Sequence, residues 1–200
     1  LGCHRSFRAK LPRRLSVLDP ACGSGNFLIG IAEECERRNG AARVDIARAL
    51  RGVDIDEGAV RECRKRIRTW AADPLPELEY TIVVGDALAG WGARGHDTFS
   101  WQRFIEQTNG EQTNGVKLFD MVVGNPPWVS YSGRQAEALS KKRRDHFHVT
   151  YASWREGWRS AHAMFCELAC HLLAPSGAFG FVLPRAVCDL KGYAALRRIL

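Results

Sequence analysis

The sequence lacks the features that place a protein in a membrane or outside the cell. No apolar run approaches the roughly 18 residues that a membrane span needs, and the N-terminus has no apolar core of the kind found in secretory signals. The seven cysteines include no Cys-x-x-Cys pair, which disfavours a disulfide framework and a zinc cluster. We therefore expect reduced thiols, a cytoplasmic location and no membrane contact.

The composition is that of one globular domain with a basic surface. The chain has 200 residues, of which 46% are hydrophobic and 26% charged, enough for a single core. A formal charge of +7 favours an anionic partner without identifying it. Residues 1–14 carry no acid and form a basic lead-in, more simply a solvated surface than a phosphate contact.

Apolar runs alternate with helical patterns along the rest of the chain. Strands are expected near 15–19, 49–54, 80–84, 119–124 and 178–183, which predicts an α/β fold with a mainly parallel sheet and helices on both faces. One continuous amphipathic helix is expected over 154–172, ended by 175–177. Residues 89–117, with their two Gln-Thr-Asn-Gly turns, and the segment after Trp128 are expected to be irregular.

A glycine-containing turn joins the first strand to a helix over residues 19–28. Such a turn lets the backbone approach a nucleotide-like cofactor. Leu28 stands where a dinucleotide motif has its third glycine, and no phosphate-binding Gly-x-x-x-x-Gly-Lys occurs. Asp19 repels phosphate but can balance a cation. The pattern favours a positively charged cofactor that carries no phosphate.

Acids also end the next two strands. Asp54 is placed to bind ribose hydroxyls, Asp56 is better explained as a helix N-cap, and Asp86 reaches the same edge. Because parallel strands end at one edge, we expect Asp19, Asp54, Asp86 and Asn125 to lie together there.

The fourth strand runs into the tetrapeptide Asn125-Pro126-Pro127-Trp128. The prolines fix φ and lack an N–H, so they hold the Asn125 amide and nearby carbonyls for an outside partner. Trp128 adds a flat aromatic face. Taken alone, the stretch fits a proline-ended strand with an Asn turn equally well.

Two further patterns have a structural and a functional interpretation. Residues 134–159 hold seven basic residues and three acids; a solvated loop is the commoner explanation, whereas the position after Trp128 favours phosphate contacts. His162, Cys166 and Cys170 lie within an apolar helix stripe, so we expect core packing and no metal.

Four motifs occur in order: Asp19–Leu28, Gly52–Asp56, Gly85–Leu88 and Asn125–Trp128. Together they resemble those of class I S-adenosylmethionine-dependent N6-adenine DNA methyltransferases of the restriction–modification type, and 177–184 and 192–200 resemble that group's later motifs. The resemblance implies a Rossmann-like class I methyltransferase fold. It further implies that 15–200 is an incomplete catalytic domain, truncated at both ends and without its target-recognition domain.

The resemblance also implies a site. Its cofactor would be S-adenosylmethionine and its substrate adenine in double-stranded DNA, with target-recognition and nuclease domains or subunits as partners in a prokaryotic cytoplasm. The residues that match the family's cofactor site are Asp19, Ala21, Cys22, Gly23, Gly25, Asn26 and Phe27 at the methionine side, Asp54 and Ile55 at the ribose, and Asp86 and Ala87 at the adenine. The catalytic residues would be Asn125, Pro126, Pro127 and Trp128.

Other interpretations remain open from the sequence. The same tetrapeptide serves enzymes that methylate a glutamine amide in proteins or a guanine amine in RNA. A catalytically silent fragment with a structural or binding role is the alternative from another class.

Overall fold

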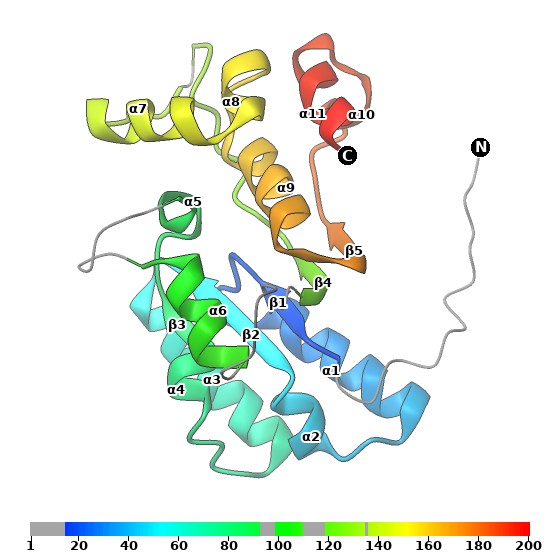
Figure 1. Cartoon of the computed structure of the whole chain (residues 1–200). Coiled ribbons are helices and arrows are strands. Elements are labelled where there is room, and N and C mark those ends of the chain that lie inside the picture. Colours follow the sequence, from blue (N-terminus) through cyan, green and yellow to red (C-terminus); the bar gives the residue numbers. More distant parts are fainter. Residues whose placement is uncertain (1–14, 93–98, 110–118, 135) are drawn as a thin grey trace.

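Five parallel strands form one sheet in the order β3-β2-β1-β4-β5 (Figure 1). The computed structural model describes residues 15–92, 99–109, 119–134 and 136–200, so the basic lead-in 1–14 and the second Gln-Thr-Asn-Gly turn lie outside the described residues. The strands are β1 (Val17–Asp19), β2 (Leu50–Asp54), β3 (Ile82–Val84), β4 (Phe119–Gly124) and β5 (Leu173–Phe181).

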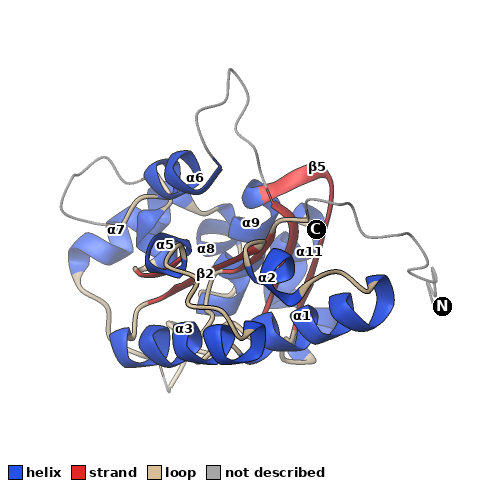
Figure 2. Ribbon diagram, turned by 90° about the horizontal axis from the view of Figure 1, so that it is seen from below, coloured by secondary structure: helices blue, strands red, loops and turns tan. Residues whose placement is uncertain are grey.

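Successive strand residues bury their side chains in separate cores on the two faces of the sheet. Val17 and Val123 pack with one set of helices, whereas Leu18 and Val122 pack with the other, as expected for a parallel sheet covered on both sides. The first set is α1 (Asn26–Asn39), α2 (Arg43–Ala47), α3 (Glu57–Ala71) and α4 (Leu78–Thr81), and Figure 2 shows α1 and α3 side by side.

The opposite face carries α5 (Ala87–Gly90), α6 (Trp101–Asn109), α7 (Lys141–Thr150), α8 (Ala152–Glu156) and α9 (Ala161–Leu172). The C-terminal segment then packs on the outer side of α9, above the sheet in Figure 1. It comprises α10 (Ala186–Asp189), the 3-10 helix η1 (Lys191–Tyr193) and α11 (Ala194–Ile199). The predicted Rossmann-like α/β fold with helices on both faces is confirmed. No helix in the described ranges is both long and apolar enough to cross a membrane.

The strand boundaries agree with the prediction within two residues, except that β5 begins five residues earlier than predicted. Residues 80 and 81 belong to α4 rather than to β3, because Leu78 and Thr81 are buried as a helical turn. Strand β5 begins at Leu173 rather than at 178, and its register with β4 shifts between Phe119 and Met121. Such an irregularity accommodates Pro175, which has no N–H to donate to the ladder.

The single helix predicted over 154–172 is wrong, because residues 157–160 separate α8 from α9. Backbone bonds to distant segments interrupt it: the Trp158 N–H donates to the Gly192 carbonyl at 2.7 Å, and the Ala161 N–H donates to the Val129 carbonyl at 2.9 Å. Ser130 and Ser160 also form an antiparallel bridge.

The regions predicted to be irregular contain helices. Helix α7 follows the tetrapeptide, and its N-cap Ser140 accepts from the Arg143 N–H at 3.3 Å. Helix α6 occupies part of 89–117, since Trp101 and Phe104 are buried in the core, and it includes the first residues of the first Gln-Thr-Asn-Gly turn. The predicted N-cap role of Asp56 is confirmed, as its Oδ1 accepts from the Ala59 N–H at 2.8 Å.

The core packing predicted for His162 and Cys166 is confirmed. Both are buried, and His162 Nε2 lies 2.8 Å from the Tyr193 hydroxyl oxygen. Burial lowers the pKa of His162 from 6.5 to about 4, so the ring is neutral near pH 7. Cys170 is partly buried on the same helix, and the cysteines of the described ranges are free thiols.

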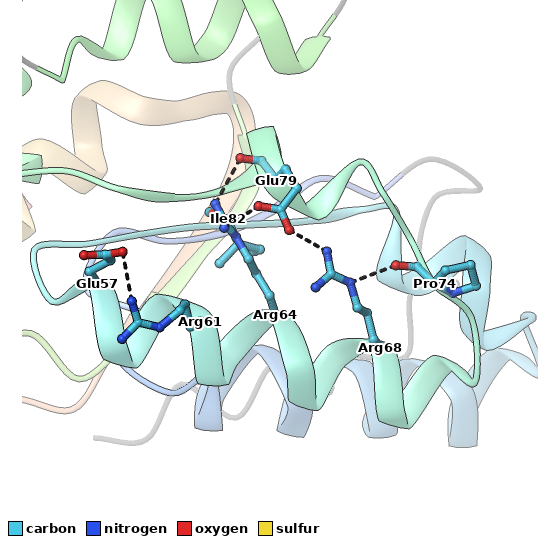
Figure 3. A network of polar contacts seen from close by, with 7 residues as sticks. All are labelled: Glu57, Arg61, Arg64, Arg68, Pro74, Glu79 and Ile82. Carbon is cyan, nitrogen blue, oxygen red and sulfur yellow. Dashed lines mark hydrogen bonds and ion pairs between the residues drawn. The ribbon is translucent and has the colours of Figure 1, made fainter.

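A network of arginines anchors α4 and β3 to α3 (Figure 3). Arg64 Nε donates to the Ile82 carbonyl at 2.8 Å, and Arg68 Nε donates to the Pro74 carbonyl at 2.8 Å. Glu79 of α4 forms ion pairs with both arginines. The network fixes β3, and therefore the position of the residues that follow it.

Glu167 of α9 joins that helix to the start of α8. Its Oε1 and Oε2 accept from the Ala152 and Ser153 N–H groups at 2.8 Å each. Burial alone opposes ionisation, but the nearby His171 ring and the hydrogen bonds from Ser153 and Ala152 outweigh it and lower the pKa of Glu167 from 4.5 to about 2.

This pKa predicts a pH-dependent contribution to stability. Because the folded pKa lies below the unfolded one, the stabilisation is present above about pH 4.5 and is lost as the pH falls towards 2. Glu167→Gln should lower the free energy of unfolding at pH 7 by on the order of 2 kcal/mol, and by less at pH 3. Urea unfolding at both pH values measures this. Glu156→Gln, whose carboxylate meets Arg198 at the surface, should change little; an equal effect of Glu167→Gln at both pH values would contradict the assignment.

Candidate active site

The predicted site residues meet at one edge of the sheet. The strand order places the carboxyl ends of β3, β2, β1 and β4 next to one another, and these ends carry or precede Asp86, Asp54, Asp19 and Asn125. The order of connection changes direction between β1 and β4, and ligands of open α/β sheets bind outside such a switch point. The predicted juxtaposition is confirmed.

The glycine turn is held by the acid of the neighbouring strand. Gly23 and Gly25 have φ values of 51° and 85°, in the left-handed region that glycine tolerates. Asp54 Oδ2 accepts from the Gly23 N–H at 2.7 Å, and Asp54 Oδ1 accepts from the Asp56 N–H at 3.0 Å. Each carboxylate oxygen keeps a lone pair for a further donor, so Asp54 can hold the turn and still accept from a ligand.

The other predicted cofactor residues differ in what they can offer. Cys22 and Ala87 are buried, so their side chains contribute packing. Ala21 and Phe27 pack partly buried against the cores, whereas Asn26 is exposed at the start of α1.

An apolar surface lies beside Asp54. Ile55 is 66% exposed, and Val84, the register partner of Asp54 on β3, is 46% exposed. Such side chains provide a contact for a flat base. Val84 was not predicted, although an apolar strand end before Gly85-Asp86 was a usable signal.

Asp86 is already engaged within the chain. Its Oδ1 caps α5 by accepting from the Ala89 N–H at 3.0 Å, and its Oδ2 forms an ion pair with Arg143 Nη2 of α7 at 2.8 Å. The Arg143 guanidinium also lies over the Phe147 ring, 5.3 Å from its centroid. A ligand amine would have to share Asp86 with Arg143. No local sequence pattern indicates that Arg143 is the partner of Asp86.

Asp19 is a buried carboxyl without a cation. It is 1% exposed, accepts from the Ala21 N–H at 3.0 Å, and forms no ion pair with any residue that the structure describes. Burial raises the pKa of Asp19 from 3.8 to about 7; the Ala21 hydrogen bond opposes this and the Asp54 charge adds to it. A positive ligand group beside Asp19 would relieve the cost of ionising it.

The backbone of Gly124 brings Asp19 next to the tetrapeptide. A Cβ at residue 124 would lie 2.5 Å from Asp19 Oδ1, and Gly124 has a φ of 153°. The Val182 N–H donates to the Gly124 carbonyl at 3.0 Å, which fixes the backbone at the point where the chain leaves β4. Asn125 therefore leaves the sheet immediately beside the buried acid.

The tetrapeptide presents a polar and an aromatic group. Asn125 is exposed, and its side chain has no hydrogen-bond partner within the described ranges. Pro126 is buried and Pro127 exposed. Trp128 is 56% exposed, with its indole N–H 3.3 Å from the Val182 carbonyl. The Asn125 amide oxygen and the Pro126 carbonyl can accept two protons of an amine, while Trp128 offers a face for a ring.

The sequence matches one protein family over most of its length. The family model described as Eco57I restriction-modification methylase matches residues 48–200. The chain is 28% identical over 184 residues to the Type II methyltransferase M.VspI of Vibrio sp. (strain 343), covering 92% of this chain and 35% of the relative. It is 25% identical over 160 residues to the adenine-specific methyltransferase PglX of Streptomyces coelicolor, covering 64% and 13% of the two chains.

A solved structure shares the fold. The Type ISP restriction-modification enzyme LlaGI, a nuclease-deletion mutant in complex with a DNA substrate mimic, superimposes with a TM-score of 0.65 at 17% identity over 94% of this chain and 19% of that one. The chain thus spans about a third of the length of the first relative and smaller shares of the other two.

The raised pKa of Asp19 predicts a variant that gains stability. Because the folded pKa lies above the unfolded one, the wild type should lose stability as the pH rises from about 4 through 7. Asp19→Asn keeps the acceptor for Ala21 but carries no charge, so it should exceed the wild type at pH 8 by roughly 2–4 kcal/mol and match it at pH 4. Urea unfolding across this range measures the difference, with the exposed N-cap variant Asp56→Asn as control. A less stable Asp19→Asn at pH 8 would contradict the buried charge.

The contact between Gly124 and Asp19 makes a steric prediction. Gly124→Ala forces its methyl group against the Asp19 carboxyl in a backbone conformation that alanine disfavours, at a cost of about 1–3 kcal/mol. Gly180→Ala on the adjacent strand β5 is the matched control, since a Cβ there meets nothing within 4 Å. Thermal unfolding of both variants checks this; equal losses would show that the approach is not tight.

Proposed function

Since the chain belongs to the Eco57I restriction-modification methylase family, we propose that it transfers a methyl group from S-adenosylmethionine to N6 of adenine in DNA. One observation carries the proposal: the buried Asp19 carboxyl lies against Gly124 at the switch point of the sheet, and Asn125 and Pro126 with their acceptors directly follow Gly124. A cationic donor and an amine acceptor would meet there.

The residues present fit S-adenosylmethionine, which supplies an electrophilic methyl group when bound. Its positive charge suits the buried, unpaired Asp19 carboxyl, and it has no phosphate for the acids of this edge to repel. Asp54 would accept from the ribose hydroxyls, while Ile55 and Val84 would pack on the adenine ring.

The remaining contacts are assigned on the same basis. The backbone of the turn, from Ala21 and Cys22 through Gly23 and Gly25 to Asn26 and Phe27, would surround the methionine part. Asp86 and Ala87 would lie at the adenine edge, where Asp86 would share its Oδ2 with Arg143.

The tetrapeptide would activate the target amine. An aromatic amine is a weak nucleophile because its lone pair is delocalised into the ring. The Asn125 amide oxygen and the Pro126 carbonyl, held by the fixed φ of Pro126 and Pro127, would accept its two protons and raise electron density on nitrogen. No separate base is needed before transfer. Trp128 would stack on the target base once it leaves the duplex.

The basic segment supports DNA as the substrate. Helix α7 exposes Lys141, Lys142 and Arg144 close to the tetrapeptide in sequence, and such residues contact phosphates independently of base sequence. PglX is named as adenine-specific, and LlaGI was solved with a DNA substrate mimic. We infer that target-recognition and nuclease parts act with this domain as other domains or subunits, in a prokaryotic cytoplasm.

The proposal predicts a separation of binding from chemistry. Asn125→Ala should lower methyl transfer at least about 100-fold, because the amine loses an acceptor in the transition state, while S-adenosylmethionine affinity stays within about twofold. Tritiated methyl transfer by the full-length protein to plasmid DNA gives the rate, and isothermal titration gives the affinity. Gln102→Ala, on the exposed surface of α6, is the amide-for-alanine control and should change neither.

Several outcomes would overturn this assignment. DNA, RNA and protein substrates should be offered separately and the labelled product digested and identified. Label on a protein glutamine or an RNA guanine would replace the substrate, and transfer unaffected by Asn125→Ala would remove the tetrapeptide from the chemistry. Cofactor binding without transfer to any substrate would indicate a silent binding module.

A further inference from the structure

Two residues of helix α3, Cys63 and Arg66, contact the glycine-containing turn of residues 19–28. Cys63 packs directly against Gly25, since a Cβ at residue 25 would lie 2.6 Å from Cys63 Sγ. Three residues later, Arg66 Nη1 donates to the Ser24 carbonyl at 2.8 Å and to Asn26 Oδ1 at 2.7 Å, and it lies 3.3 Å from Ser24 Oγ. Ser24 and Asn26, the two neighbours of Gly25, are therefore both held by the Arg66 guanidinium.

Arg66 differs from the other cations of α3 in its partners. Arg61 pairs with Glu57 at 2.9 Å and Lys65 with Glu62 at 3.5 Å, while Arg64 and Arg68 share Glu79, as Figure 3 shows for the arginines. Arg66 forms no ion pair in the described residues and binds only neutral oxygens of the turn. Its contacts therefore serve the turn rather than the charge balance of the helix.

Two side chains from other elements form hydrogen bonds with the turn. Asp54 holds its first half through the Gly23 N–H, and Arg66 holds its second half through Ser24 and Asn26. Asp54 is also the proposed ribose ligand. Arg66, by contrast, extends from α3, and its hydrogen bonds go only to residues of the turn.

We propose that Arg66 is a positioning residue for the amino-acid end of S-adenosylmethionine. This rests on the proposed function, in which residues 19–28 surround the methionine part. By fixing Ser24 and Asn26 on either side of Gly25, Arg66 keeps the turn in its binding conformation before the ligand arrives. Without it, the second half of the turn around Gly25 is free to sample other conformations, and the free-energy cost of ordering it falls on ligand binding.

The effect should depend on which part of the ligand is present. Arg66→Ala should weaken S-adenosylhomocysteine binding about tenfold, the scale of one lost hydrogen bond to a charged group. Binding of 5′-methylthioadenosine, which keeps the adenine and ribose but lacks the amino acid, should stay within about twofold. Arg66→Lys should lie between, because one nitrogen makes all the contacts and an ammonium can partly replace it. Arg61→Ala, a surface variant of the same helix, should affect neither ligand.

Isothermal titration of the full chain with both ligands tests this, with thermal unfolding to confirm folding. A selective loss for S-adenosylhomocysteine supports the proposal. Equal losses for both ligands indicate general loosening and overturn it, as does no loss for either. If Arg66→Ala does not fold, the ratio of the two losses in Arg66→Lys decides by the same criterion. Failure of the unaltered chain to bind either ligand would refute the proposed function itself, and the inference with it.

Discussion

The contact between the buried Asp19 carboxyl and the backbone of Gly124 determines the geometry of the sheet edge that carries the candidate site. Asp19 ends β1, Gly124 ends β4, and the Asp19 carboxyl fits against the end of β4 because residue 124 carries no Cβ. The charge of Asp19 is costly to bury, as its raised pKa shows. A fold selected for stability alone would place a neutral or apolar residue there, so the acid is best explained by what binds beside it.

Elements on both sides of the sheet hold the segments around that contact. The glycine turn is tethered to β2 through Asp54 and to α3 through Arg66, while α3 is itself fixed to α4 by the arginine network. The chain beyond Trp128 is held by residues 159–161, since the Tyr131 N–H donates to the Arg159 carbonyl at 2.8 Å. These contacts fix the backbone on both sides of Gly124 in the absence of a ligand.

The sequence predicted the features that depend on local pattern. Continuous apolar runs indicated β1, β2 and β4, the following glycines and acids indicated their ends, and parallel pairing then required those ends to meet. The break between α8 and α9 had only a weak local signal, Gly157 followed by Ser160, because it depends mainly on bonds from Trp158 to Gly192 and from Ala161 to Val129. Arg143 and Arg66 were missed for the same reason: each matters through a partner in a distant segment, and many arginines of this basic chain look equivalent in sequence.

The strap formed by residues 157–160 has a mechanical consequence. Its backbone is bonded on one side to the C-terminal segment at Gly192 and on the other to the stretch that directly follows the tetrapeptide. The stretch that follows Trp128 and the C-terminal segment are therefore joined through four residues that lie between α8 and α9. A substitution that shifts these four residues would act both on the segment that follows the tetrapeptide and on the packing of the C-terminal segment.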